Sequence, residues 1–250
     1  LTVFLIGGLV SYLLAQHTLQ PIEDNMAAQS RFVSDASHEL STPLTALLAA
    51  NEVALMNSKL TLKQAKQVIT DNVDDVKRLQ KLTNSMLGLL KEDKLEIQKG
   101  KVGLQSVIAR AMNLVVNQAL AKDITIDDKT KNFLLLGDRQ SLEQLFTILL
   151  DNAIKYSNKG GTITISSSKK GKHVSVAVAD AGIGMSDEVK SQIFTRFYRA
   201  EESRTTAGYG LGLSIAERII KAHGGRINVD SEQNVGSTFT VILPAYNKKK

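Results

Sequence analysis

The first third of the chain alternates apolar and polar positions with the period of an α-helix. Between residues 22 and 57, apolar side chains recur at steps of three and four, which predicts one long helix with a single buried stripe. The polar stretch NSKLT interrupts this pattern, and a second long helix is predicted from residue 62 to residue 91. The stripe of the first helix consists of Val33, Ala36, Leu40, Leu44, Leu47, Leu48, Ala54 and Leu55.

The second predicted helix carries more apolar positions than one antiparallel hairpin can bury. A heptad pattern with two polar interruptions joins Ala65, Ile69, Asn72, Val76, Leu79, Thr83, Met86 and Leu90. A second stripe joins Leu62, Val68, Val73, Leu82, Leu87 and Leu89. Two such hairpins can bury both stripes as a four-helix bundle. The pattern therefore predicts a homodimer, and the alternative is a monomeric hairpin that packs on the rest of the chain.

The pattern changes after the charged stretch KEDKLEIQKGK, residues 91–101, which predicts a linker. Further helices are predicted at 104–120, 139–156 and 211–222, the second of them capped by Asp138. Strands are predicted at 124–127, 133–136, 226–231 and 237–244, and a hairpin at 161–168 and 173–180 around a KKGK turn. Residues 181–209 lack a clear period. Because these elements do not alternate as βαβ units, the predicted fold class is α+β, with one mixed sheet and helices on one face.

The chain opens with the uncharged run LTVFLIGGLVSYLL, residues 1–14. A bilayer span needs about 20 apolar residues, and no basic residues precede the run as they would in a signal peptide. The run is followed at once by polar residues, so we interpret residues 1–21 as the end of a transmembrane helix and a short linker. A buried helix of a soluble core is the alternative. The prediction implies a protein at the cell membrane.

Composition narrows the possible chemistry. The absence of cysteine excludes disulfides, zinc–thiolate sites and thiol catalysis. The net charge of +6 suits a phosphate-bearing ligand or an anionic surface, and part of it comes from a basic tail at residues 247–250. No aromatic residues are interleaved with a basic stripe, so no nucleic-acid partner is expected.

The stretch LLDNAIKYS, residues 149–157, carries polar side chains on one face of a predicted helix. Asn152 and Tyr156 are four residues apart, and Lys155 is three residues after Asn152. An amide oxygen can ligate Mg²⁺, which commonly bridges phosphate oxygens, and a lysine supplies positive charge to the same phosphates. The alternative is an ordinary solvated helix face.

The stretch DAGIGM, residues 180–185, follows a predicted strand. The carboxylate of Asp180 can accept a hydrogen bond from the exocyclic amine of adenine, and Gly182 and Gly184 would let the backbone approach a flat base. A simple turn is the alternative. The polar segment at residues 186–207 could cover a nucleotide, with Arg196 or Arg199 reaching a terminal phosphate.

The stretch GYGLGL, residues 208–213, places three glycines before a helix, where free N–H groups can bind phosphate. It does not match a P-loop, and it does not follow a strand as a Rossmann motif does.

The six stretches SHELSTPL, LLDNAIKYS, DAGIGM, IFTRFYRA, GYGLGL and GSTFTV together resemble, in family order, the H, N, G1, F, G2 and G3 elements of bacterial two-component sensor histidine kinases. The resemblance covers roughly residues 22–246. It implies a dimerisation and histidine-phosphotransfer hairpin at 22–92, a linker at 93–101 and a catalytic ATP-binding α/β sandwich of the Bergerat type at 102–246. It also implies that this catalytic core lies on the cytoplasmic side of the membrane.

In this family the histidine of the H element is phosphorylated by ATP, and here that residue is His38. Glu39 would act as hydrogen-bond acceptor or general base to the imidazole, and Thr42 fits a position linked to dephosphorylation of the partner regulator. Pro43 would bend the helix just beyond the reactive site. The phosphoryl group would then pass to an aspartate on the receiver domain of a response regulator. Since Ala36 and Leu40 each lie about 200° from His38 around the helix axis, the imidazole is expected to point away from the buried stripe.

The resemblance also assigns the nucleotide site. Asn152 would ligate Mg²⁺, Lys155 and Arg199 would contact phosphate, Tyr156 would lie near the nucleotide and Asp180 would bind adenine. The remaining implied ATP-binding positions, which shape the pocket and the hinges of its cover, are Gly182, Gly184, Gly208, Gly210, Leu211 and Gly212.

Two positions depart from the family pattern. Ser41 stands where the H element usually has Arg or Lys, which leaves the balance of kinase and phosphatase activity open, and Ile148 stands where the N element often has a further Asn. Three alternatives therefore stay open: a phosphatase-dominant sensor, an ATPase in which Asp151 or Glu143 activates water, and a non-enzymatic dimeric scaffold.

Overall fold

The structure is a computed structural model that describes residue 19 and residues 33–90, 97–200 and 208–246. It divides into two compact units, Leu1–Met86 and Leu87–Lys250. Apart from Leu19, the predicted membrane segment lies outside the described residues, as do the basic tail and residues 93–96 of the predicted linker. Within the described ranges, no helix is long and apolar enough to cross a membrane.

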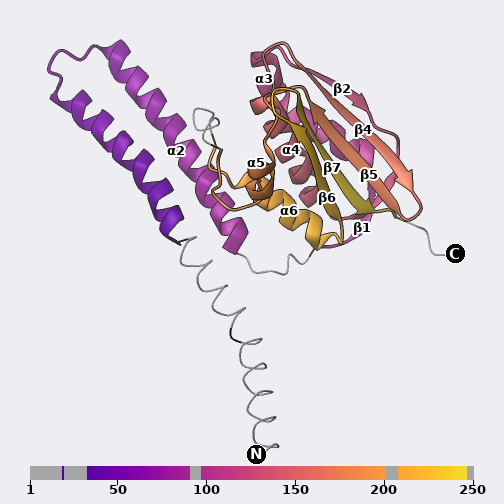
Figure 1. The fold of residues 1–250 in the computed structure, drawn as a ribbon. Coiled ribbons are helices and arrows are strands. Elements are labelled where there is room, and N and C mark those ends of the chain that lie inside the picture. The colour runs from indigo at the N-terminus through magenta and orange to yellow at the C-terminus, as the bar shows by residue number, and fades with distance from the viewer. Residues whose placement is uncertain (1–18, 20–32, 91–96, 201–207, 247–250) are drawn as a thin grey trace, which may run out of the picture. The chain divides into compact units, whose positions relative to one another are not determined.

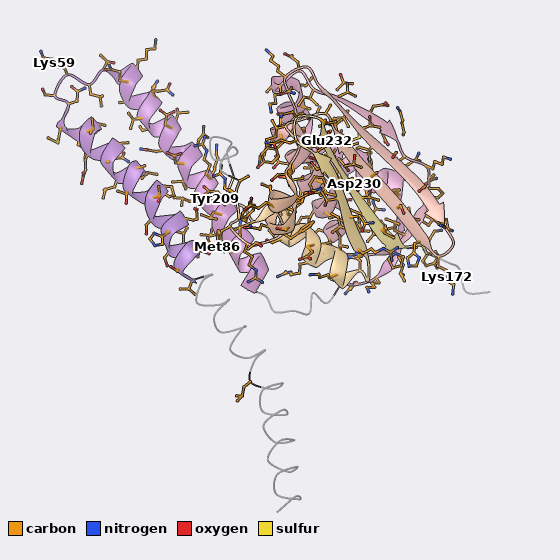
Figure 2. All side chains as sticks on the ribbon, viewed as in Figure 1. Lys59, Met86, Lys172, Tyr209, Asp230 and Glu232 are labelled. Carbon is orange, nitrogen blue, oxygen red and sulfur yellow. The ribbon has the colours of Figure 1, made fainter. Side chains whose placement is uncertain are left out.

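The N-terminal unit contains the predicted helical hairpin. Residues 33–56 form its first helix, and α2 (Leu62–Leu90) forms its second (Figure 1). The turn between them, which contains Lys59 (Figure 2), is fixed by local hydrogen bonds. The Asn57 side chain accepts the Lys59 amide at 3.0 Å, and Thr61 and Gln64 cap α2 reciprocally, through Thr61 N–H to Gln64 Oε1 at 3.0 Å and Gln64 N–H to Thr61 Oγ1 at 3.3 Å. The predicted break at NSKLT is therefore confirmed.

The two helices of the hairpin meet through small, polar and aliphatic side chains. A side-chain hydrogen bond joins the two helices, in which the Asn72 amide donates to Asn51 Oδ1 at 2.8 Å. On α2 the half-buried stripe contains Val68 and Asp75, whereas Ile69 and Val76 of the predicted heptad stripe are 60% and 55% exposed. The heptad stripe as a whole therefore does not form the hairpin contact, which also takes Val68 from the second predicted stripe.

The C-terminal unit is α+β, as predicted. A five-stranded sheet has the order β2-β4-β5-β7-β6, and a two-stranded sheet pairs β1 with β3. The element bounds are β1 Gly100–Gly103, α3 Leu104–Ala121, β2 Thr125–Lys129, β3 Leu134–Gly137, α4 Arg139–Tyr156, β4 Thr162–Lys170, β5 His173–Asp180, α5 Asp187–Gln192, α6 Gly212–Ala222, β6 Arg226–Glu232 and β7 Gly236–Pro244.

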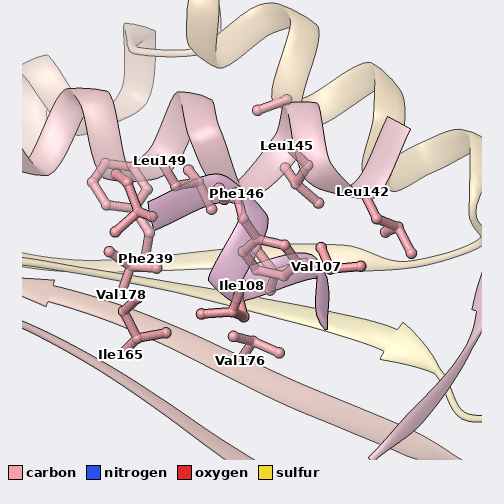
Figure 3. Packing of buried hydrophobic residues seen from close by; sticks show 14 of the residues in the cluster. Val107, Ile108, Leu142, Leu145, Phe146, Leu149, Ile165, Val176, Val178 and Phe239 are labelled. Carbon is pink, nitrogen blue, oxygen red and sulfur yellow. The ribbon is translucent and has the colours of Figure 1, made fainter. Parts of the chain in front are cut away.

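The core of this unit lies between the larger sheet and the helices α3, α4 and α6, which cover one of its faces (Figure 1). Alternate residues of the strands point toward the helices because side chains of a strand alternate between its two faces. Figure 3 shows Ile165, Val176, Val178 and Phe239 of the strands beneath residues of α3 and α4. The fully buried helix residues opposite them are Val107, Ile108, Leu142, Leu145, Phe146 and Leu149.

The sheet is mixed, because β2 runs parallel to β4 while the other neighbours in the five-stranded sheet are antiparallel. The structure adds two elements that the sequence did not predict. Strand β1 falls partly within the predicted linker and pairs with β3, where its Val102 is buried. Helix α5 interrupts the segment predicted as irregular, and the Ser186 hydroxyl caps it by accepting the Val189 amide at 3.3 Å.

Candidate nucleotide-binding site and phosphoacceptor region

A pocket of the C-terminal unit lies where the end of α4, the loop after β5, α5 and the start of α6 meet β7. Of the predicted nucleotide residues, Asn152, Tyr156, Asp180, Gly184 and Arg199 line it. The other lining residues are Ile183, Met185, Ser186, Val189, Ile193, Tyr198, Ala200, Leu213, Gln233, Ser237 and Phe239. The pocket therefore combines one carboxylate, two side-chain amides and one guanidinium with an extensive apolar wall.

The Asp180 carboxylate sits at the end of β5 in a half-buried position. Burial raises the pKa of this carboxyl above its ordinary value, while hydrogen bonds from the Gly182 and Ser237 amides lower it in part. The Gly182 amide lies 3.0 Å from Asp180 Oδ1. These bonds fix the carboxylate at the pocket wall, where it is able to accept a further donor from a ligand.

The glycines after Asp180 allow close contact between backbones. A Cβ on Gly182 would overlap the carbonyl oxygen of Tyr156, and a Cβ on Gly184, whose φ is +63°, would overlap the carbonyl oxygen of Glu232. Backbone hydrogen bonds join the same segments, from Ile183 N–H to Tyr156 O at 3.2 Å and from Asn234 N–H to Ile183 O at 2.7 Å. The loop is thus held between the end of α4 and the turn after β6. Close approach to a base remains a prediction for both glycines.

The last two turns of α4 present Asn152 and Lys155. Both side chains are half-buried, and Lys155 Nζ lies 2.6 Å from Asp151 Oδ2. Glu143 Oε1 lies 3.7 Å from the Arg139 guanidinium. Both carboxylates considered as activators of water thus lie beside cations of the same helix, one turn away.

The start of α6 is tied to the segment before residue 201. The Phe197 amide donates to Gly210 O at 3.0 Å, and Gly210 has a φ of +68°. A Cβ on Gly210 would lie 2.6 Å from the Phe197 carbonyl carbon. Leu211 is buried, and a Cβ on Gly212 would lie 3.3 Å from Ile148 Cγ2. The departure at Ile148 thus places a methyl group against the first turn of α6.

Two of the predicted positions, Gly208 and Lys155, lie close to each other but outside the pocket lining. A Cβ on Gly208 would be 3.7 Å from Lys155 Nζ, so this glycine and the lysine are close neighbours. Residues 201–207, which the sequence assigned to the cover of the pocket, lie outside the described residues.

The residues present fit a purine nucleotide with a divalent cation. The apolar wall suits a flat aromatic base, and the Asp180 carboxylate suits its amine. The Asn152 amide supplies a hard oxygen ligand of the kind that Mg²⁺ accepts together with phosphate oxygens. Sequence reasoning missed Gln233 on the turn after β6 and Ser237 on β7. The signal that could have indicated them is the GSTFTV stretch, which contains Ser237 and begins three residues after Gln233.

In the N-terminal unit, His38 is exposed, whereas Ala36 and Leu40 are half-buried, as their spacing predicts. The Thr42 hydroxyl donates to the His38 carbonyl at 3.1 Å, which is the local bond expected of a threonine inside a helix. Pro43 lies within a continuous helix, and Ser41 is exposed. The imidazole is therefore accessible from solvent in the single chain.

Both units match families of known proteins. Residues 28–94 match the His Kinase A (phospho-acceptor) domain, and residues 137–247 match the family of histidine kinase-, DNA gyrase B-, and HSP90-like ATPases. Sensor protein CiaH of Streptococcus pneumoniae serotype 4 is 31% identical over 258 residues, which cover 99% of this chain and 56% of CiaH. The histidine-protein kinase ArlS of Staphylococcus aureus is 33% identical over 229 residues, which cover 90% of this chain and 51% of ArlS. The chain spans about half the length of these relatives.

Solved structures give the same result. Histidine kinase ThkA in complex with the response regulator protein TrrA matches with a TM-score of 0.73 at 22% identity, over 90% of this chain and 64% of that one, which supports the fold. Full-length ShkA in complex with AMPPNP matches with a TM-score of 0.66 at 25% identity, over 88% of this chain and 47% of that one. With a phospho-acceptor hairpin followed by this ATPase domain, and with relatives named as sensor kinases, the chain belongs to the sensor histidine kinases of two-component systems.

Proposed function

We propose that this protein transfers the γ-phosphoryl group of ATP to His38 and then passes it to an aspartate of a response regulator receiver domain. The observation that carries the proposal is the pocket of the C-terminal unit, in which a fixed carboxylate, an amide ligand and an apolar wall occur together. An exposed histidine on the hairpin supplies the acceptor. The family domains in both units support this division of roles.

The transfer step requires a neutral imidazole. A ring nitrogen of His38 attacks the γ-phosphorus in line, an N–P bond forms, and the bond from that phosphorus to the bridging oxygen of ADP breaks. The proton on the other ring nitrogen is held by an acceptor, for which Glu39 is our candidate. Phosphohistidine then loses its phosphoryl group to the regulator carboxylate, which restores the imidazole.

The nucleotide is positioned by side chains of the C-terminal unit. Asp180 accepts the exocyclic amine of adenine, and the apolar residues of the pocket contact the base. Asn152 holds Mg²⁺, whose charge neutralises the phosphates when it is bound. Lys155 and Arg199 bind phosphate, Tyr156 contacts the nucleotide, and the glycines at 182, 184, 208, 210 and 212, together with Leu211, shape the pocket and the hinges of its cover.

The exposed apolar residues of the hairpin support a homodimer. On the first helix, Leu44, Leu48 and Leu55 are 53%, 58% and 86% exposed, and on α2, Leu62, Ile69 and Val73 are 74%, 60% and 46% exposed. On each helix, the exposed set forms a stripe that lies roughly 80° around the helix axis from the side that contacts the other helix. Viewed from the N-terminus of each helix, the direction of this rotation is the same. Because the helices are antiparallel, both stripes lie on the same side of the hairpin. A second copy that covers this side would complete a four-helix bundle.

We propose further that the protein acts at the cell membrane, with both units on the cytoplasmic side. The uncharged run of residues 1–14 supports this location. Phosphatase activity toward the regulator is a second candidate function, which the presence of Thr42 and the absence of a basic residue at Ser41 favour.

The test of the main proposal is incubation of the chain with γ-labelled ATP and Mg²⁺, followed by addition of candidate receiver domains. Wild type should acquire an acid-labile label and lose it to a regulator, while His38→Gln should bind ATP but remain unlabelled. Label retained by His38→Gln would refute the assignment of the acceptor. Steady release of phosphate by both proteins without a phosphoprotein would instead support an ATPase.

A further inference from the structure

We propose that Lys122 is a positioning residue for nucleotide binding, because its ammonium holds the end of α4 in place. This inference rests on the proposed function. Lys122 Nζ donates to three carbonyl oxygens at this end, those of Ile154 at 2.9 Å, Lys155 at 2.6 Å and Ser157 at 2.8 Å. An ammonium has three donors, so all of them are used. Lys122 does not line the pocket, and the family elements quoted from the sequence do not include it.

The backbone of Lys122 belongs to a second helix end. Lys122 follows the last residue of α3, and its backbone N–H donates to the carbonyl oxygens of Ala119 and Leu120. Its own carbonyl accepts the Gly160 amide at 3.1 Å, in the segment that follows α4. The next residue, Asp123, has a φ of +55°, which turns the chain sharply away from α3. One residue thus connects the ends of α3 and α4 through both its backbone and its side chain.

Electrostatics favours a cation at this position. The last carbonyls of an α-helix lack intrahelical partners, and the C-terminus of a helix carries a partial negative charge. Both α3 and α4 end here, so the Lys122 ammonium lies near two such termini. Charge-assisted hydrogen bonds are roughly twice as strong as neutral ones. An uncharged side chain of the same length would leave these carbonyls of α4 without their donor.

The carbonyls held by Lys122 belong to the turn that builds the pocket. Lys155 is a predicted phosphate ligand, and Asn152 and Tyr156 of the same helix end line the pocket. The Tyr156 carbonyl accepts the Ile183 amide, and Ser157 pairs with Gly182 across an isolated bridge. A shift of the α4 terminus would therefore move the amide and lysine ligands and the loop that follows Asp180 at the same time. Misplacement by about 1 Å is enough to cost on the order of 100-fold in a positioned site.

The absence of cysteine from the chain allows a direct test of the charge. Lys122→Cys is alkylated in denaturant with either 2-bromoethylamine, which recreates an ammonium at the reach of lysine, or 1-bromopropane, which gives a neutral side chain of equal length. Both adducts are refolded, and Mg-ADP binding is measured by calorimetry at a temperature where circular dichroism shows each to be folded. Lys159→Met serves as control, because Lys159 also follows the end of α4 but pairs with Asp123 at an exposed position.

We expect the ammonium adduct and the control to bind Mg-ADP like wild type, and the neutral adduct to bind about 10-fold or more weakly, as expected for misplaced ligands. The Ile183 amide should also exchange hydrogen faster in the neutral adduct, and the faster exchange should be confined to this loop. A general loss of stability would instead speed exchange throughout the unit. Equal affinity of the two adducts would overturn the proposal. If the neutral adduct does not refold, Lys122→Gln is measured in the same way, and wild-type affinity and exchange in that variant would overturn it. Failure of wild type to bind Mg-ADP would instead refute the nucleotide site itself.

Discussion

At the residue scale, Asp180 combines two opposing influences on one carboxyl group. Burial raises its pKa, and the amides of Gly182 and Ser237 stabilise its ionised form. The acceptor needed for adenine is therefore lost at a higher pH than for an exposed aspartate. We expect the affinity for Mg-ADP to fall as the pH is lowered through this raised pKa.

Asp180→Asn should weaken Mg-ADP binding by about 10- to 100-fold, the cost of losing a hydrogen bond to a charged group, and its affinity should change less with acid than that of wild type. Calorimetric titrations at several pH values measure both effects. Asp187→Asn is the control, because Asp187 is exposed and pairs with Lys190, and neither of these residues lines the pocket. Unchanged binding by Asp180→Asn would contradict the assignment of the adenine contact.

His223 is a buried histidine that the sequence did not single out. The Asp138 amide donates to its Nε2 at 3.0 Å, so its Nδ1 carries the proton and contacts the Ile219 carbonyl at 2.7 Å. Burial chiefly lowers the pKa of His223, and the nearby Lys99 lowers it further, against the opposing effects of Ile219 and Asp138. The ring is thus held neutral between the C-terminal end of α6 and the start of α4.

This arrangement predicts that the stability of the folded protein falls in acid. As the pH falls below about 6.5, the unfolded chain binds a proton at His223 before the folded chain does, so stability is lost by up to about 1.4 kcal/mol per pH unit until the lowered pKa is reached. His223→Gln keeps an acceptor for the Asp138 amide but does not titrate. Urea unfolding between pH 5 and pH 8 should therefore show a smaller acid loss for this variant. Parallel pH profiles would contradict the prediction.

At the element scale, local signals gave the most accurate predictions. Helix α4 runs from Arg139 to Tyr156 as expected, because Asp138 caps it by accepting the Ser141 amide at 2.8 Å and its apolar face has a clear period. Strand β1 was missed, since a four-residue strand bounded by glycines owes its existence to pairing with β3, more than 30 residues later. The apolar wall of the pocket was missed for the same reason, because its residues come from segments joined only by the fold.

The backbone contacts of the loop after β5 make a paired prediction. Gly184 and Gly171 both have positive φ, of +63° and +60°, but only Gly184 faces the backbone of Glu232, whereas nothing lies within 4 Å of a Cβ at Gly171. Gly171→Ala, in the β4–β5 turn beside Lys172 (Figure 2), should cost about 1–2 kcal/mol from backbone strain alone.

Gly184→Ala should cost at least about 1–3 kcal/mol more, because the backbone must shift as well, and it should weaken Mg-ADP binding. Urea unfolding compares the stability of the two variants, and calorimetry compares their affinities. Equal losses of stability would show that the contact with Glu232 does not constrain the loop.

At the scale of the whole molecule, the sequence predicted two apolar stripes on the second helix but did not specify which of them forms the contact within the hairpin. A heptad pattern cannot distinguish the contact within a hairpin from the contact between hairpins, because both recur at steps of three and four. In the structure Val68 and Asp75 lie in the half-buried stripe, and Ile69 and Val76 join the exposed side. The exposed side is what a second copy would have to cover.

Adjacent positions on α2 test this requirement. Ile69 belongs to the exposed apolar stripe, whereas Thr70 lies on another side and its hydroxyl bonds to the Lys66 carbonyl at 2.9 Å. Burial of one Ile in each copy contributes about 3–6 kcal/mol per dimer, so Ile69→Glu should raise the dimer dissociation constant by about 100-fold or more. Thr70→Glu should leave it unchanged. Sedimentation equilibrium measures both constants, and circular dichroism verifies that each variant stays helical. A fully dimeric Ile69→Glu protein would show that the copies associate through another surface, because a carboxylate without a partner cannot be buried in this stripe at so small a cost.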